Sequence, residues 1–277
     1  MTLIQAIVLG LVQGLSEFIP ISSTAHLRIV PALLGWDDPG AAASAVIQLG
    51  TLLAVLIYFA RDIIKITRGF LSALFRGKPF ETYEARLGWY IIAGSVPIVV
   101  IGLLLKDFIE GGARSLWIIA ASLIGLAIFL WIAERAAAKS ELRVLGDITF
   151  KDAILVGLAQ CLALVPGSSR SGTTIMMGLF RKLTHEAAAR FSFLLSIPAI
   201  LGSGLFELYV ERAHLAEVGW VAIAVAVFVS FVSGWLSIYF LLRYLRTHTT
   251  GLFIIYRIAL GIVIIGLLLG GILQPFG

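Results

Sequence analysis

Charged residues are scarce in this chain of 277 residues, since Asp, Glu, Lys and Arg together make up 13% of it. Soluble domains carry roughly a quarter, so the shortage excludes an ordinary soluble domain. Cysteine is almost missing as well. The single Cys161 excludes an internal disulfide and, without soft ligands nearby, argues against a structural zinc site. The N-terminus has no basic region and no obvious cleavage site, so we expect no removable signal peptide.

Apolar residues are abundant, at 60%, and the mean hydropathy is +1.01. Most of the uncharged stretches reach the ~20 residues that a helix needs to cross a ~30 Å hydrocarbon core. They cover residues 43–60, 87–105, 115–133, 191–206, 218–242 and 258–277. The stretch 191–206 is long enough only if its helix extends back through 187–189. We therefore predict an all-α integral membrane protein with six transmembrane helices in a single domain, residues 1–277.

Two further apolar segments are too short to cross. Residues 6–20 would make ~22 Å of helix, and Pro20 ends this segment before the polar sequence SSTAH. Residues 153–166 repeat the arrangement before GSSRSGTT. Each segment predicts a re-entrant hairpin, in which one half-helix enters the membrane and a second returns. Irregular backbone at this depth is tolerated only beside protein or a water-filled cavity.

The loop charges are consistent with this topology. With six spans and two hairpins, fifteen basic residues fall on one face of the membrane, which the positive-inside rule places in the cytoplasm. They are Arg61, Lys65, Arg68, Arg76, Lys78, Arg86, Arg135, Lys139, Arg143, Lys151, Arg181, Lys182, Arg190, Arg243 and Arg246. The opposite face has only Lys106, Arg114 and Arg212 as basic residues. Both termini are therefore expected outside.

The two short segments also resemble each other. The aligned pairs are Gly10 with Gly157, Gln13 with Gln160 and, after a one-residue deletion, Pro20 with Pro166 and Ser22–Ser23 with Ser168–Ser169. We predict an internal repeat, approximately residues 1–134 (hairpin 5–34) and 152–273 (hairpin 152–181). Each half holds three spans, so the second is inserted upside down relative to the first, and the two hairpin tips should meet near the midplane. Chance similarity of apolar sequence is the alternative.

The tips carry groups suited to an anion. A helix that starts at a Pro-x-Ser-Ser sequence points free N–H groups towards the tip, and Arg170 supplies a planar fork that matches phosphate oxygens. The first tip offers Gln13, Glu17, Ser22, Ser23, Thr24 and His26. The second offers Gln160, Ser168, Ser169, Arg170, Ser171, Thr173 and Thr174. We expect the tips to form a phosphate-binding cavity inside the membrane.

Glu17 and His26 add chemistry to this cavity. Beside a bound phosphoryl group they could activate a nucleophile, hold a divalent cation or protonate a leaving group. Ser23 could attack phosphorus if a base lay within reach, and His26 could itself be the nucleophile. Gln13 and Gln160 could have only a structural role and bridge the hairpins, and Arg28 could extend to the outer headgroups. Gln48, which interrupts a span, could reach the cavity. Arg257 could pair with Glu17 or with a phosphate.

These motifs resemble the undecaprenyl-diphosphate phosphatase family of bacterial inner membranes, the bacitracin-resistance type. The family signature Glu/Gln-x-x-x-Glu is present as QGLSE (13–17) and is followed by PISSTAH (20–26). The second signature, Pro-Gly-x-Ser-Arg-Ser-x-x-Thr, is present as PGSSRSGTT (166–174). The likeness also takes in IQLGTLLAV (47–55) and runs essentially from end to end.

The resemblance implies hydrolysis of undecaprenyl diphosphate to the monophosphate carrier used in peptidoglycan synthesis, with a divalent cation, Mg²⁺ or Ca²⁺. Glu17 would be catalytic or metal-linked, His26 and Ser23 the candidates for nucleophile or acid/base, and Arg170 the diphosphate clamp. Ser169, Ser171 and Thr174 would support that clamp, and Ser22, Thr24 and Gln13 would complete the binding set. The expected partners are a polyprenyl diphosphate and the bilayer, with no nucleic acid; a homodimer is left open.

Gln13 departs from the many family members with Glu at this position. The first tip then holds a single carboxylate, which weakens any scheme that needs two for one metal. We expect a bacterial inner-membrane protein whose cavity opens outward, because the first hairpin enters from that side. A lipid flippase or anion transporter is the alternative function, since inverted repeats with broken helices are typical of alternating access.

Overall fold

The computed structural model describes residues 1–38, 40–105 and 115–275. Within these ranges the chain is helical, apart from turns and one isolated bridge between Arg143 and Leu183. The elements are α1 (Leu3–Phe18), α2 (Ser23–Leu34), α3 (Gly40–Tyr58), α4 (Ala60–Phe75), α5 (Tyr83–Leu104), α7 (Leu116–Ala137), η2 (Leu145–Asp147), α8 (Phe150–Gln160), η3 (Cys161–Leu164), α9 (Arg170–Phe180), α10 (His185–Val210), α11 (Arg212–Val218), α12 (Trp220–Tyr244) and α13 (Gly251–Leu269).

Six of these helices are long and apolar enough to cross a membrane: α3, α5, α7, α10, α12 and α13. The prediction of a multi-pass, all-α membrane protein with six spans is therefore confirmed. The stretch expected to be short becomes the 26-residue helix α10, which begins before residues 187–189, as the length requirement demanded. The predicted outer-face basic residues Lys106 and Arg114 lie outside the described residues.

Two pairs of shorter helices accompany the six spans, one before α3 and one between α7 and α10. The first pair is α1, of 16 residues, and α2, of 12; the second is α8 and α9, of 11 residues each. At 1.5 Å per residue none exceeds ~24 Å, which is less than a ~30 Å hydrocarbon core. The connecting residues, 19–22 in the first pair and 165–169 in the second, are called the two tips below.

A serine caps the second helix of each pair in the same unusual conformation. Ser22 has φ 77° and ψ 98°, and Ser169 has φ 71° and ψ 114°. Each hydroxyl accepts a hydrogen bond from the backbone N–H three residues later, at Ala25 and at Gly172. A positive φ is uncommon outside glycine, so its recurrence marks Ser22 and Ser169 as equivalent. The matching caps are one residue out of step with the sequence alignment of Ser22 with Ser168, because the second tip contains one extra residue between its proline and its cap.

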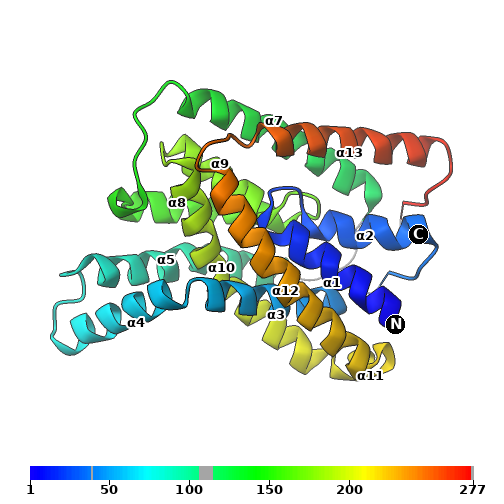
Figure 1. Ribbon diagram of the computed structural model, residues 1–277, viewed down its shortest axis with the longest axis horizontal. Coiled ribbons are helices and arrows are strands. Elements are labelled where there is room, and N and C mark those ends of the chain that lie inside the picture. The colour runs from blue at the N-terminus through cyan, green and yellow to red at the C-terminus, as the bar shows by residue number, and fades with distance from the viewer. Residues whose placement is uncertain (39, 106–114, 276–277) are drawn as a thin grey trace.

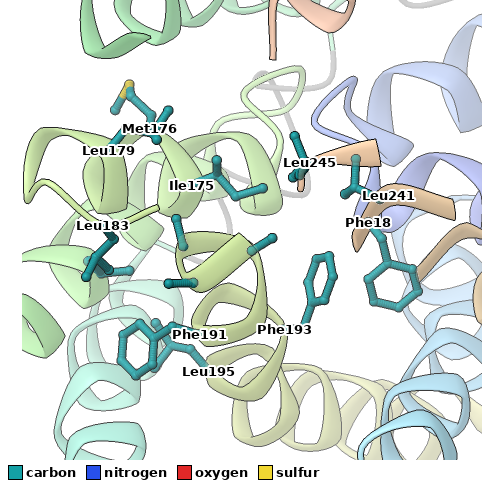
Figure 2. Packing of buried hydrophobic residues seen from close by; sticks show 14 of the residues in the cluster. Phe18, Ile175, Met176, Leu179, Leu183, Phe191, Phe193, Leu195, Leu241 and Leu245 are labelled. Atoms are coloured by element: carbon teal, nitrogen blue, oxygen red, sulfur yellow. The ribbon is translucent and has the colours of Figure 1, made fainter. Parts of the chain in front are cut away.

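The helix pairs pack into the bundle of spans. Helix α1 lies against α12, which in turn packs on α3, while α7 and α13 lie side by side (Figure 1). The α1–α12 contact is close because Gly14 has no side chain: a Cβ there would meet the Ser233 hydroxyl at 2.0 Å. The main hydrophobic core joins the two halves, with the Phe18 ring of α1 against the Phe193 ring of α10 at 5.1 Å (Figure 2). This packing brings the two tips together.

Candidate active site

Glu17 is the centre of the candidate site. It lies in the last turn of α1 and is only 4% exposed. Its Oε2 accepts hydrogen bonds from Ser23 Oγ at 2.7 Å, from Gln13 Nε2 at 2.8 Å and from Gln48 Nε2 at 3.2 Å. Gln13 reaches Glu17 because residues four apart share a helix face, and Ser23 does so because α2 starts immediately after the first tip. Gln48 comes from α3 and joins the cluster, as one reading of the sequence allowed.

Arg170 completes the cluster from the other helix pair. It is the first residue of α9, and its Nη2 donates to Glu17 Oε1 at 3.0 Å. Its second nitrogen, Nη1, donates to the Ser192 carbonyl of α10 at 3.3 Å. The Thr174 hydroxyl donates to the Arg170 carbonyl at 2.7 Å and lies 2.6 Å from the Ser192 hydroxyl. Arg170 is thus held on both its backbone and its guanidinium.

A cavity of about 420 Å³ opens beside this cluster. Its polar end is formed by Glu17, Ser23, Thr24, Gln48, Ser169 and Arg170. Most of the remaining wall is apolar and comes from α5 and α10, with Ile98, Val99, Leu103, Ala199, Ile200 and Phe206. The cavity therefore joins a charged end, suited to an anionic group, to a greasy wall.

The other predicted binding residues hold the tips in place and do not line this cavity. Ser22 caps α2, and Ser171 Oγ lies 3.2 Å from Ser169 Oγ and donates to the Ile19 carbonyl of the first tip at 3.4 Å. Thr174 fixes Arg170 as described, and Gln13 supports Glu17. Of the expected binding set, only Ser169, Thr24 and Arg170 face the cavity.

His26 is not brought to the Glu17–Arg170 pair. Its Nδ1 faces the Ser22 carbonyl at 2.7 Å, and its Nε2 faces the Tyr256 hydroxyl at 2.7 Å. A carbonyl only accepts hydrogen bonds, so the Nδ1–H tautomer fits, and Nε2 is left to accept from Tyr256. The two rings also stack, 5.7 Å apart. His26 is absent from the cavity wall, and the partner that holds it, 230 residues away, carried no signal in the sequence.

Arg257 contacts backbone carbonyls and is not paired with Glu17, as one reading of the sequence had suggested. It is 1% exposed, and its guanidinium donates to backbone carbonyls of both tips. Nη1 donates to Pro20 at 3.2 Å and to Ser168 at 3.0 Å, and Nη2 donates to Gly167 at 3.1 Å. Arg257 is therefore a clamp between the tips. Arg28 does not extend to the outer headgroups, because it is 3% exposed and its Nε lies 3.4 Å from Asp38 Oδ2.

A preformed divalent-cation site does not fit this arrangement. Among the residues that the structure describes, no three His, Cys, Asp or Glu side chains are grouped to hold a metal. Glu17 receives four donors, three on Oε2 and one, from Arg170, on Oε1. The other carboxylate of the cavity wall, Glu207, lies ~22 Å along α10 from the Ser192 contact of Arg170 at 1.5 Å per residue. One ion cannot span that distance.

The fold and the cavity define a class: a multi-pass membrane protein that receives an anionic headgroup with an apolar chain attached. The chain belongs to the family described as bacitracin resistance protein BacA, whose sequence model matches residues 6–263. A protein named undecaprenyl-diphosphatase from Chlorobium phaeobacteroides (strain BS1) is 56% identical over 281 residues, 99% of this chain and 100% of that one. Proteins of the same name from Chlorobaculum tepidum and Chloroherpeton thalassium are 54% and 55% identical over 282 and 283 residues. These alignments cover 99% and 100% of this chain and the full length of each relative.

Two contributors to the site were missed by the sequence reasoning. The Ser192 carbonyl accepts from Arg170, and its hydroxyl lies 2.6 Å from that of Thr174, but a single serine in an apolar helix looks like many others. Glu207 lines the far end of the cavity and was assigned to no role. An acidic residue near the end of a long apolar stretch was its only signal.

Proposed function

We propose that this protein hydrolyses undecaprenyl diphosphate to undecaprenyl phosphate and inorganic phosphate, and so recycles the carrier lipid of peptidoglycan synthesis. The observation that carries this proposal is the cavity in which Glu17, Ser23 and Arg170 meet an apolar wall. The full-length likeness to proteins named undecaprenyl-diphosphatase supports the same substrate. Membership of the family described as bacitracin resistance protein BacA supports a role in bacitracin resistance.

Substrate binding follows from the two ends of the cavity. The diphosphate takes the polar end, where Arg170 and the N-termini of α2 and α9 supply positive charge and N–H donors. The prenyl chain lies along the apolar residues of α5 and α10 and leaves between these helices into lipid. Arg170 exchanges its contact with Glu17 for one with the diphosphate. Glu17 then loses its cationic partner and becomes a better base.

Ser23 is the nucleophile in this proposal. Its Oγ is 2.7 Å from Glu17 Oε2, the distance required for a general base to take the hydroxyl proton. The oxygen attacks the terminal phosphorus, the phosphoanhydride bond breaks, and undecaprenyl phosphate leaves with the bonding electrons. Water then attacks the phosphoserine, releases inorganic phosphate and returns a proton to Ser23. Arg170 stabilises the charge that develops on the transferred phosphoryl group.

A divalent cation, Mg²⁺ or Ca²⁺, remains part of the proposal through the family resemblance, and no step above depends on it. His26 acts as a positioning residue, because it holds the carbonyl of the cap residue Ser22 next to the nucleophile.

We also propose that α1–α2 and α8–α9 are re-entrant hairpins of an inverted repeat, with halves of approximately 1–134 and 152–273. Their short lengths and the matching serine caps, Ser22 and Ser169, support this arrangement. The excess of basic residues on one face supports a bacterial inner-membrane orientation with both termini periplasmic and the cavity open to that side.

The test is phosphate release from a polyprenyl diphosphate by the protein purified in detergent. We expect release by the native chain and a loss of about 10²–10³-fold in Arg170→Ala, the scale for removal of a preorganised charge contact. Glu17→Ala should lose activity to a similar extent. Binding of the lipid without any phosphate release would contradict the proposal and favour the lipid flippase or anion transporter.

A further inference from the structure

The two helices that form the apolar wall of the cavity, α5 and α10, contain glycines with two different surroundings. In α10 a Cβ at Gly204 would meet Leu49 Cδ2 at 2.5 Å, and in α5 a Cβ at Gly94 would meet the Ala153 carbonyl oxygen at 2.9 Å. Gly94 and Gly204 are therefore needed for the close approach of neighbouring helices. This is the usual reason for a small residue in a membrane span.

Gly102 of α5 and Gly202 of α10 have no such packing role, and both line the cavity. A Cβ at Gly102 would make only an ordinary contact, 3.5 Å from Leu164 Cδ2. Gly202 is exposed and, apart from its own helix, no heavy atom of the described residues lies within 4 Å of the position of its Cβ. Glycine is a poor helix former, so these two positions need another explanation. Their missing side chains leave space in the cavity.

The surroundings of this space suit a hydrocarbon chain. Residues three or four positions from each glycine share its helix face, and several of them line the cavity as well: Ile98 and Val99 in α5, Ala199 and Phe206 in α10. All four side chains are apolar. The space between the two glycines is therefore bordered by hydrocarbon on both helices.

The cavity can hold only the beginning of a polyprenyl chain. Its volume is about 420 Å³, which is within the roughly 300–1,000 Å³ of pockets for drug-sized ligands. The diphosphate takes the polar end, so the part of the chain next to the headgroup is the part that passes Gly102 and Gly202. A chain that comes from lipid gains little from an apolar wall, because lipid tails are as apolar as leucine. The space available to the chain, rather than attraction to the wall, therefore decides whether it fits.

We propose that Gly102 and Gly202 form the subsite for the first isoprene units of the substrate, and that the space left by these glycines determines which chains are accepted. This inference rests on the proposed function, because it takes a prenyl diphosphate as the ligand. A larger side chain at either position discriminates by a clash with the chain. It leaves the polar end of the cavity unchanged.

The experiment compares the binding of two non-hydrolysable ligands to the full chain in detergent, by titration calorimetry. Farnesyl methylenebisphosphonate and methyl methylenebisphosphonate carry the same headgroup, but only the first has isoprene units. In Gly102→Leu and in Gly202→Leu we expect the affinity for the farnesyl compound to fall by about tenfold or more, the scale for a group that does not fit an apolar pocket. The affinity for the methyl compound should not change.

Gly266→Leu is the matched control. Gly266 is also exposed in a span and, apart from its own helix, has no heavy atom of the described residues within 4 Å of the position of its Cβ. It belongs to α13, however, and is not among the described residues that line the cavity. Its substitution should leave both affinities unchanged. Gly102→Ala and Gly202→Ala add only a methyl group and should give smaller losses than the leucine variants.

A second measurement needs no substitution. A farnesyl methylenebisphosphonate with a photoreactive diazirine on its first isoprene unit is bound to the native chain and illuminated. We expect crosslinks to α5 and α10 within one helical turn of Gly102 and Gly202. Crosslinks confined to other helices overturn the inference, whether or not the leucine variants fold.

The outcomes separate the subsite from the proposed function. An unchanged farnesyl affinity in both leucine variants, or an equal loss for both ligands, overturns the subsite even if the native chain releases phosphate from a polyprenyl diphosphate. A selective loss of the farnesyl compound, without phosphate release by the native chain, supports the subsite and overturns the phosphatase. Failure of both compounds to bind the native chain overturns both.

Discussion

Arg170 Nη2 lies 3.0 Å from Glu17 Oε1, and the two residues are 153 positions apart in the chain. This ion pair joins the first residue of α9 to the last turn of α1, so it links the two helix pairs through side chains alone. Its polar partners Gln13, Ser23 and Ser192 lie on α1, α2 and α10, so two further helices contribute to it. The pair is therefore a contact between the two helix pairs at the polar end of the cavity.

Loss of one partner of this pair should destabilise the protein more than loss of both. A buried charge left alone costs about 3–5 kcal/mol, whereas neutral residues at both positions leave none. We expect Arg170→Gln to lower the thermal unfolding temperature clearly and Glu17→Gln/Arg170→Gln to recover part of it, with both variants inactive. Unfolding of the detergent-solubilised protein is the measurement. A double variant less stable than the single one would contradict a buried pair.

Replacement of Ser23 should stop catalysis without preventing binding. Ser23→Ala is expected to lower kcat by about 10³-fold or more, as for a lost nucleophile. The affinity of the protein for a non-hydrolysable prenyl methylenebisphosphonate should change little. Brief reaction of the native enzyme with labelled substrate and acid quenching should yield phosphoserine at position 23. Thr24, the neighbouring hydroxyl on the cavity wall, gives the control, since Thr24→Val should still form the phosphoserine. Full activity in Ser23→Ala would exclude this nucleophile.

The serine caps should tolerate glycine better than alanine. At Ser22, with φ 77°, glycine relieves the backbone penalty of a left-handed residue while it loses the cap hydrogen bond to Ala25. Alanine keeps the penalty and loses the cap, which costs about 1 kcal/mol. We expect Ser22→Gly to unfold at a higher temperature than Ser22→Ala. The same order should hold at Ser169 if the two tips are equivalent.

Asp152 should make stability fall only in strong acid. This residue lies at the start of α8, outside the six spans, and is fully buried. Burial by itself raises its pKa, but hydrogen bonds from Arg143, Thr149 and Arg181 outweigh this effect and lower the pKa to about 2. A carboxyl group whose folded pKa is lowered stabilises the fold above its unfolded pKa of about 4.

The stabilisation from Asp152 is then lost between about pH 4 and pH 2. Thermal unfolding over this range is the measurement, and Asp152→Asn is expected to show a smaller drop than the native chain. From pH 5 to pH 8 the difference between the two proteins should be constant. A difference that changes in that range would contradict the assignment.

The six spans could be predicted because their signal is local: each is a long run of apolar residues, and length alone separates it from the short helices. The short helices were also visible, since Pro20 and Pro166 end the runs. The choice of Glu17 and Arg170 as site candidates followed from the cost of charge in a membrane, which makes an intramembrane ionisable residue functional by default, and the structure brings the two into contact.

What the sequence did not show depends on contacts between distant segments. The partner of His26 is Tyr256, and no pattern links a histidine in α2 to a tyrosine in α13. The role of Arg257 could not be foreseen, because its partners are backbone carbonyls, which every residue carries. The one-residue difference between the tips was hidden as well, since consecutive serines align equally well in two registers.

The clamp formed by Arg257 has a consequence for biogenesis. This arginine belongs to α13, which is made after the carbonyls that it holds, those of Pro20, Gly167 and Ser168. Until α13 inserts, these acceptors have no guanidinium to join them. We therefore expect the two tips to be joined only after α13 has been made, so that a nascent chain stalled before α13 carries Glu17, Ser23 and Arg170 without this clamp.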